Sequence, residues 1–133
     1  MTYKNICKVL HGKSVLLQDK KFLYSDVDET LLLWPENPHE PKNSECIKIP
    51  FNGIDYYLKP HKKNIELLKN CANMDYRVVL WSMGGERWAK EVCKVLDLEN
   101  YVDYCLAKPD LILDDLNPSN WMPENLFQED NED

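Results

Sequence analysis

The chain has 133 residues, of which 44% are hydrophobic and 29% are charged, a balance that suits one globular domain with a core of its own. Its 23 acidic residues outnumber the 16 basic ones and give a formal net charge of -7, so the overall field repels nucleic acid and anionic membranes unless a basic patch opposes it. No apolar run approaches the roughly 20 residues that a membrane helix needs. The five cysteines are odd in number and form no C-x-x-C pair, which disfavours a disulfide framework or a zinc site. We therefore expect a cytoplasmic protein with reduced thiols and no membrane contact.

The domain is expected to cover residues 1–127, followed by an acidic, disordered tail over residues 128–133, because a run of Glu, Asp and Asn buries little apolar surface. The first 21 residues fit either a hairpin around Gly12 or a short helix followed by a strand,.

The run from Phe22 to Ser25 predicts a buried strand at the centre of a parallel sheet,. Asp26 and Asp28 follow directly, at the strand end where open α/β sheets bind ligands,. Two acids this close to a buried strand repel each other and lose water, so the pair is costly unless a cation or a proton is shared there.

A β-hairpin flap is expected next to the two acids, within residues 34–59. Three prolines between residues 34 and 41 exclude a helix there,. Strand-like runs over residues 46–51 and 54–58 flank Asn52-Gly53, and Asn-Gly is typical of a two-residue type I′ turn. Such a flap would cover the acids and exclude water.

The rest of the chain alternates helix and strand. Helical periodicity runs from about residue 59 to 73 and from 86 to 96, and strands are predicted over residues 77–81, 104–107 and 111–113,. This alternation predicts an α/β fold with a parallel sheet.

A different polar group follows each of the four predicted strands, and parallel strands would bring these groups to one edge of the sheet. They are Asp26 with Asp28, then Ser82, then Lys108, then Asp114 with Asp115. Carboxylates suit Mg²⁺, while a lysine and the free N–H groups of Gly84 and Gly85 suit an anion,. Together these groups are expected to bind a phosphate, with one of Asp26 and Asp28 as the nucleophile and the other as the general acid and base.

In these motifs the chain resembles phosphatases of the haloacid dehalogenase superfamily. The matching stretches are Asp26-Val27-Asp28-Glu29-Thr30, Leu80-Trp81-Ser82, Lys108-Pro109 and Leu111-Ile112-Leu113-Asp114-Asp115. They occur in order between residues 22 and 115. The resemblance implies a minimal Rossmann-like domain, with a parallel sheet flanked by helices and the hairpin flap in place of a cap domain.

The resemblance also implies roles for the motif residues. Asp26 would attack the phosphate, and Asp28 would protonate the leaving oxygen and then activate water. Ser82, Met83 and Lys108 would bind the phosphoryl oxygens, with Thr30 in support. Mg²⁺ would be held by Asp26, by the Asp28 backbone carbonyl and by one of Asp114 and Asp115, of which Asp114 is favoured.

Two details narrow the resemblance. Glu29 stands where glycine is commonest in the superfamily, and D-x-D-E-T is similar to the branch that dephosphorylates the polymerase C-terminal domain. Only Pro109 to Leu113 separate Lys108 from Asp114, a compact spacing similar to that of small phage and bacterial phosphatases. A capless site suits a bulky phosphorylated substrate, or a site closed by a partner subunit.

Two other functions stay open. One is a phosphatase for nucleic-acid 3′ ends, similar to the capless phosphatase domain of phage polynucleotide kinase, although the net acidity opposes it. The other is a non-catalytic phosphate-binding module, against which the presence of both Asp26 and Asp28 speaks. The sequence leaves the oligomeric state open.

Overall fold

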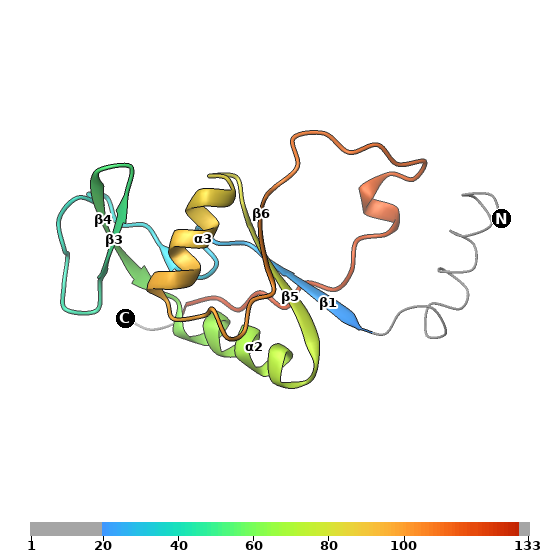
Figure 1. Ribbon diagram of the computed structural model, residues 1–133, viewed down its shortest axis with the longest axis horizontal. Helices are drawn as coiled ribbons and strands as arrows, with labels where there is room; N and C mark the ends of the chain where they lie inside the picture. The colour runs from blue at the N-terminus through green and yellow to red at the C-terminus, as the bar shows by residue number, and fades with distance from the viewer. Residues whose placement is uncertain (1–19, 131–133) are drawn as a thin grey trace.

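The computed structural model describes residues 20–130, so the hairpin or helix predicted before residue 20 lies outside the described residues. Three parallel strands form one sheet in the order β1-β5-β6: β1 (Lys21–Ser25), β5 (Tyr76–Ser82) and β6 (Tyr104–Ala107). Helix α2 (Lys62–Asn73) packs on β5 and β1, and helix α3 (Glu86–Val95) packs on β5 and β6 (Figure 1). A parallel sheet flanked by helices confirms the predicted fold class.

The register of the three strands brings their carboxyl ends to one edge of the sheet. Ser25 at the end of β1 pairs with Leu80, and Ala107 at the end of β6 pairs with Ser82. The residues that follow β1 and β6 therefore emerge on the same side, on either side of the end of β5.

The centre of the sheet is β5, not β1 as the sequence predicts. Val78 and Leu80 of β5 are fully buried, whereas Phe22 and Tyr24 of β1 are 46% and 51% exposed. The reason is the strand order: β5 has a partner on each side, and β1 pairs with β5 alone among the described strands.

The fourth strand predicted over residues 111–113 is also wrong. This segment has no regular secondary structure, and the exposed fractions of Leu111, Ile112 and Leu113 are 93%, 52% and 104%. In Figure 1 the chain leaves the sheet after β6 as a wide loop. Because no strand within residues 20–130 lies beside this segment to complete a hydrogen-bonded ladder, its apolar residues alone do not make it a strand.

The flap is an antiparallel sheet in the order β2-β4-β3, formed by β2 (Leu32–Leu33), β3 (Ile47–Phe51) and β4 (Ile54–Pro60). At the β3–β4 turn, Asn52 and Gly53 have φ angles of 53° and 77°, as a type I′ turn requires. The predicted hairpin is therefore present. Arg87 of α3 donates to the Asn52 side chain at 2.8 Å, so the flap turn is anchored on this helix.

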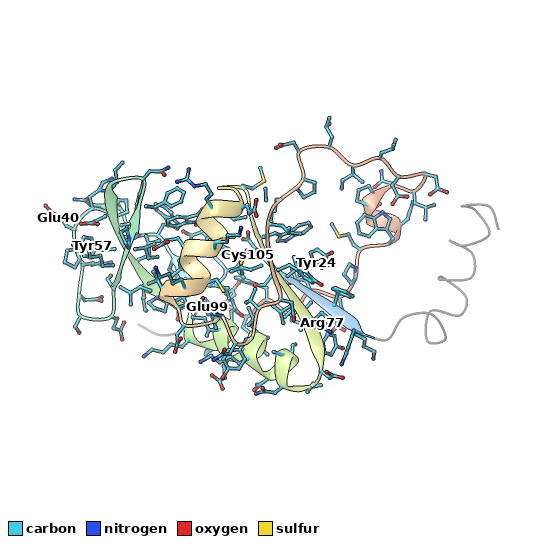
Figure 2. All side chains as sticks on the ribbon, viewed as in Figure 1. Tyr24, Glu40, Tyr57, Arg77, Glu99 and Cys105 are labelled. Carbon is cyan, nitrogen blue, oxygen red and sulfur yellow. The ribbon has the colours of Figure 1, made fainter. Side chains whose placement is uncertain are left out.

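Side chains from the sheet, both helices and the flap form one continuous core. Buried members include Leu68 of α2, Ala89 and Val92 of α3, and Ile49 and Leu58 of the flap. Figure 2 shows side chains filling the space between the flap, which carries Tyr57, and α3. The flap is thus part of the domain's core. Within residues 20–130, no helix is both long enough and apolar enough to cross a bilayer.

The last described residues run back along α2. The Asn64 side chain donates to the Gln128 carbonyl at 3.2 Å and accepts from the Gln128 N–H at 3.0 Å. Lys59 of β4 forms an ion pair with Asp130 at 3.4 Å. Gln128 and Asp130, which the sequence assigns to a disordered tail, therefore contact the domain.

Candidate active site

The two acids lie on a tight loop between β1 and β2. The Val27 carbonyl accepts hydrogen bonds from the N–H groups of Thr30 and Leu31 at 3.2 and 2.8 Å. Val27 and Leu31 are almost fully buried, so they anchor the loop in the core. Glu29 takes a left-handed backbone with a φ of 64°, which reverses the chain direction. The loop therefore leaves the side chains of Asp26 and Asp28 available for polar contacts.

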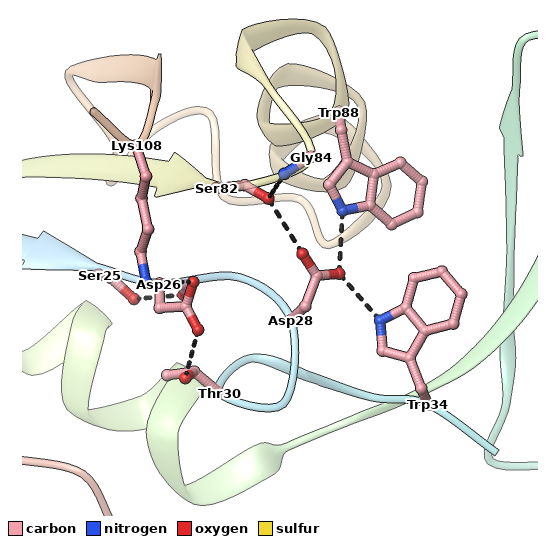
Figure 3. Close-up of polar contacts among 9 residues, drawn as sticks. All are labelled: Ser25, Asp26, Asp28, Thr30, Trp34, Ser82, Gly84, Trp88 and Lys108. Carbon is pink, nitrogen blue, oxygen red and sulfur yellow. Dashed lines mark hydrogen bonds and ion pairs between the residues drawn. The ribbon is translucent and has the colours of Figure 1, made fainter. Parts of the chain in front are cut away.

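Asp26 meets Lys108, the residue that follows β6. The Lys108 Nζ lies 3.1 Å from Oδ1 of Asp26, and the Thr30 hydroxyl donates to Oδ2 at 3.0 Å (Figure 3). The two charged side chains are about 30% exposed, so a ligand from solvent can reach them. Residues 82 positions apart in the sequence are thus brought together at the strand ends, as the sequence predicts.

Asp28 is held by three hydrogen-bond donors. The Ser82 hydroxyl donates to Oδ2 at 3.0 Å, and the indole N–H groups of Trp34 and Trp88 both donate to Oδ1, at 2.9 and 3.0 Å (Figure 3). The donors come from β5, from the chain just after β2, and from α3. This carboxylate is therefore fixed from three directions.

Ser82, at the end of β5, is fully buried and linked to its neighbours on both sides. Besides donating to Asp28, its hydroxyl accepts from the Gly84 N–H at 2.9 Å, and its carbonyl accepts from the Lys108 N–H at 2.9 Å. In this arrangement Ser82 orients Asp28 and the start of the Lys108 segment. Contact between its hydroxyl and a phosphate requires the bond to Asp28 to open. Met83 beside it is 74% exposed.

Asp114 and Asp115 lie in the irregular loop that follows β6. Asp114 accepts a hydrogen bond from the N–H of Leu116, two residues on, at 2.9 Å. No three His, Cys, Asp or Glu side chains within residues 20–130 are grouped to hold a metal ion. Asp26 and Asp28 are adjacent hard oxygen donors, but the structure does not group them with Asp114 or Asp115, one of which the sequence predicts as the third ligand. The role of the Asp114-Asp115 pair stays a prediction.

A cavity of about 370 Å³ opens beside Asp26. Thr30 and Lys108 line it near the acid, while α2 and residues 124–127 supply much of the remaining wall. Lys108 is the single basic side chain among its described lining residues. Asn64 joins the acid loop to the C-terminal segment here, because its side chain also donates to the Thr30 carbonyl at 3.0 Å.

Three residues at this site are missed by the sequence reasoning. The pattern of α3 marks Trp88 as a core residue, Trp34 lies in a proline-rich loop, and Asn64 is one polar residue on an amphipathic helix. Trp34 and Trp88 are far apart in the sequence, and no sequence pattern indicates that both contact Asp28. Only the packing of the flap against α3 brings them together.

One of three comparisons with known proteins finds a match. A family model for NLI interacting factor-like phosphatases matches residues 21–121. The match includes the acid loop, Ser82, Lys108 and the Asp114-Asp115 pair. No curated protein and no solved structure matches the chain.

Proposed function

Because the chain belongs to the NLI interacting factor-like phosphatase family, a phosphatase family of the haloacid dehalogenase superfamily, we propose that it is a Mg²⁺-dependent phosphomonoester hydrolase that works through an aspartyl-phosphate on Asp26. Membership makes the chain a phosphatase of this type. The observation that carries the finer proposal is the contact of Asp26 with Lys108, 3.1 Å apart across the ends of β1 and β6.

In the proposed first step, a carboxylate oxygen of Asp26 attacks phosphorus. A bond forms between that oxygen and phosphorus as the bond to the ester oxygen breaks, and Asp28 gives its proton to the departing oxygen. In the second step water attacks the aspartyl-phosphate and Asp28 takes a proton from that water. Phosphate leaves, and both acids return to their starting states.

Lys108 is proposed to bind the transferring phosphoryl group. Its ammonium is a compact charge that stabilises phosphoryl oxygens in the transition state. Its distance to Oδ1 of Asp26 places that charge next to the attacking oxygen. The Met83 backbone, between β5 and α3, would supply an N–H donor. The N–H groups of Gly84 and Gly85, which the sequence predicts to be free for an anion, donate instead to the hydroxyl and the carbonyl of Ser82, at 2.9 and 3.1 Å.

Mg²⁺ is proposed for the completed site, in which the Asp114-Asp115 step has moved to Asp26. Within residues 20–130 no third acid is grouped with Asp26 and Asp28, so the second carboxylate ligand would have to come from a movement of the Asp114-Asp115 pair. Two features support the movement: Leu111 and Leu113 are exposed to solvent, and β1 has an unpaired edge among the described strands. Docking the segment on that edge would bury apolar surface. The ion would then neutralise negative charge on the phosphate.

The direct test is hydrolysis of p-nitrophenyl phosphate by the purified chain. We expect activity with Mg²⁺, loss on chelation, and a fall of at least about a thousandfold in kcat for Asp26→Asn, because the amide is no nucleophile. Asp97→Asn is the matched control, because it makes the same substitution at an exposed aspartate outside the site. The φ of Asp97 is 57°, and Asn tolerates a positive φ, so the variant should fold and keep its activity. Activity that survives chelation contradicts the metal requirement, and activity retained by Asp26→Asn contradicts the mechanism.

Docking of the loop is tested separately by hydrogen exchange. We expect the amides of residues 111–115 to exchange rapidly without metal and to gain protection when Mg²⁺ and orthovanadate are added. Asp114→Asn is expected to reduce this protection more than Asp110→Asn, an exposed acid in the same loop. Equal exchange with and without Mg²⁺ and orthovanadate would mean that the segment does not join the site.

A further inference from the structure

An aromatic cluster joins the flap to the acid loop. Trp88 of α3 lies with its ring centroid 5.2 Å from Phe51 of β3, 5.7 Å from Tyr56 of β4 and 6.0 Å from Trp34. Trp34 also contacts Tyr56, with ring centroids 5.7 Å apart. The polar ends of both indoles are directed at Asp28 (Figure 3), so the cluster connects flap packing to one carboxylate.

Both indoles donate to the same oxygen. The N–H groups of Trp34 and Trp88 lie 2.9 and 3.0 Å from Oδ1 of Asp28, and an indole N–H is a donor only. Two donors match the two lone pairs that one carboxylate oxygen offers. Oδ2, which has the Ser82 hydroxyl as its partner, is therefore the oxygen that can exchange a proton with a substrate, because a hydroxyl can either donate or accept.

The Trp88 indole is fixed by its surroundings. Trp88 is 5% exposed, and its ring lies directly over Gly84. A Cβ at Gly84 would come within 2.9 Å of Cδ1 of Trp88 and 3.2 Å of Oγ of Ser82, closer than side chains normally pack. The absence of a side chain at Gly84 therefore leaves room for Trp88 and Ser82, which donate to Oδ1 and Oδ2 of Asp28.

We propose that Trp34 and Trp88 are positioning residues that direct Oδ2 of Asp28 toward the leaving oxygen of the substrate. The inference rests on the proposed function. It assigns the two indoles to one step, the breaking of the ester bond as the Asp28 proton moves to the departing oxygen. It also makes the flap part of this step, because Phe51 and Tyr56 hold the indoles in place.

Leaving-group dependence separates this role from a general structural one. An alkyl phosphate has a poor leaving group that needs the proton, whereas p-nitrophenolate leaves without one. Ester cleavage is the step that kcat/KM reports, because the later attack of water is common to both esters. A displaced Asp28 therefore lowers kcat/KM for the alkyl ester and largely spares kcat/KM for the p-nitrophenyl ester. For Trp34→Phe and Trp88→Phe, which remove the N–H and keep a ring, we expect kcat/KM for the alkyl ester to fall about tenfold to a hundredfold and kcat/KM for the p-nitrophenyl ester to change little.

Trp121→Phe is the matched control, since Trp121 is 43% exposed at the end of the short 3₁₀ helix η1 (Pro118–Asn120). It should leave the ratio of the two rates unchanged. Asp28→Asn removes the proton donor itself, so we expect it to give the largest change in that ratio. If Trp88→Phe does not fold, as a thermal melt would reveal, the more exposed Trp34→Phe decides the question.

The proposal is overturned if the tryptophan variants lower kcat/KM for both esters equally, or for neither. Its failure is distinct from failure of the proposed function. A wild-type chain that hydrolyses neither ester removes the phosphatase mechanism itself. A wild-type chain that hydrolyses both, with a rate ratio unchanged in Trp34→Phe and Trp88→Phe, removes only the role of the indoles.

Discussion

Glu29 has the most constrained backbone in the acid loop. Its φ of 64° lies in the left-handed region, which costs a residue with a Cβ about 1 kcal/mol. The Glu29 side chain offsets part of this cost, because its Oε1 accepts a hydrogen bond from the backbone N–H of Trp34 at 3.1 Å. The resemblance that marks this position as usually glycine thus agrees with the observed backbone. The glutamate adds a contact that a glycine lacks.

Substitutions at Glu29 separate these two effects. Glu29→Ala keeps the backbone cost and loses the hydrogen bond, whereas Glu29→Gly loses both. We expect the glycine variant to unfold at higher urea concentration than the alanine variant, with a difference of about 1 kcal/mol in the free energy of unfolding. An alanine variant at least as stable as the glycine variant would argue against backbone strain at this loop.

Cys93, on the inner face of α3, makes the free energy of unfolding depend on pH. Burial raises the pKa of its thiol to about 12, so the folded state keeps the proton where the unfolded state loses it. The contribution of this thiol to stability is therefore full below the pKa of the unfolded thiol, about 8.5, and falls by at most about 1.4 kcal/mol per pH unit above it.

Urea unfolding between about pH 8 and pH 10 tests this effect. We expect the free energy of unfolding to fall less over this range for Cys93→Ala than for wild type. Cys46→Ala is the control for loss of a thiol outside α3, and an unchanged fall in Cys93→Ala would contradict this account.

At the scale of elements, local pattern predicts most of the fold. The apolar runs at β1, β5 and β6 and the Asn52-Gly53 turn specify their own structures, and parallel strands explain why Asp26 meets Lys108. Two outcomes depend on packing that no local pattern contains. Residues 111–113 have the composition of a strand but no neighbouring ladder in the described chain, and Trp34 and Trp88 reach Asp28 only because the flap folds against α3.

Asn64 is the residue through which α2 holds two other segments. Its side chain bonds the Thr30 carbonyl of the acid loop and both backbone groups of Gln128, and it is 5% exposed. Removing it leaves part-buried backbone groups without these partners, which is costly. The sequence gives no sign of this, because an asparagine on a helix is most often a surface residue.

Asn64→Ala tests this link. We expect the free energy of unfolding to fall by about 2 kcal/mol, because the Thr30 carbonyl and the backbone groups of Gln128 lose their hydrogen bonds to Asn64,. Asn70→Ala, an exposed position on the same helix, is the matched control for helix propensity and should change stability by less than about 0.5 kcal/mol. If both variants unfold at the same urea concentration, the contacts of Asn64 contribute nothing to stability.

At the scale of the whole molecule, the net charge of -7 sets which substrates approach easily. The single basic side chain described in the cavity wall is Lys108, enough for one phosphate but not for a polyanion. We expect kcat/KM for a 3′-phosphorylated oligonucleotide to be below that for p-nitrophenyl phosphate and to rise with added salt, as repulsion is screened. A steep fall with salt would instead indicate counterion release and a nucleic-acid substrate.

The central claim is that Asp26 carries the phosphoryl group during turnover. Its most direct test is intact mass spectrometry after mixing the chain with p-nitrophenyl phosphate and Mg²⁺ and quenching in acid within one turnover, followed by peptide mapping. We predict one added phosphoryl group on the peptide that contains Asp26, absent in Asp26→Asn and lost when the wild-type sample is left to turn over. Hydrolysis that proceeds with no phosphorylated protein at any quench time, or with the adduct on another residue, would contradict the account.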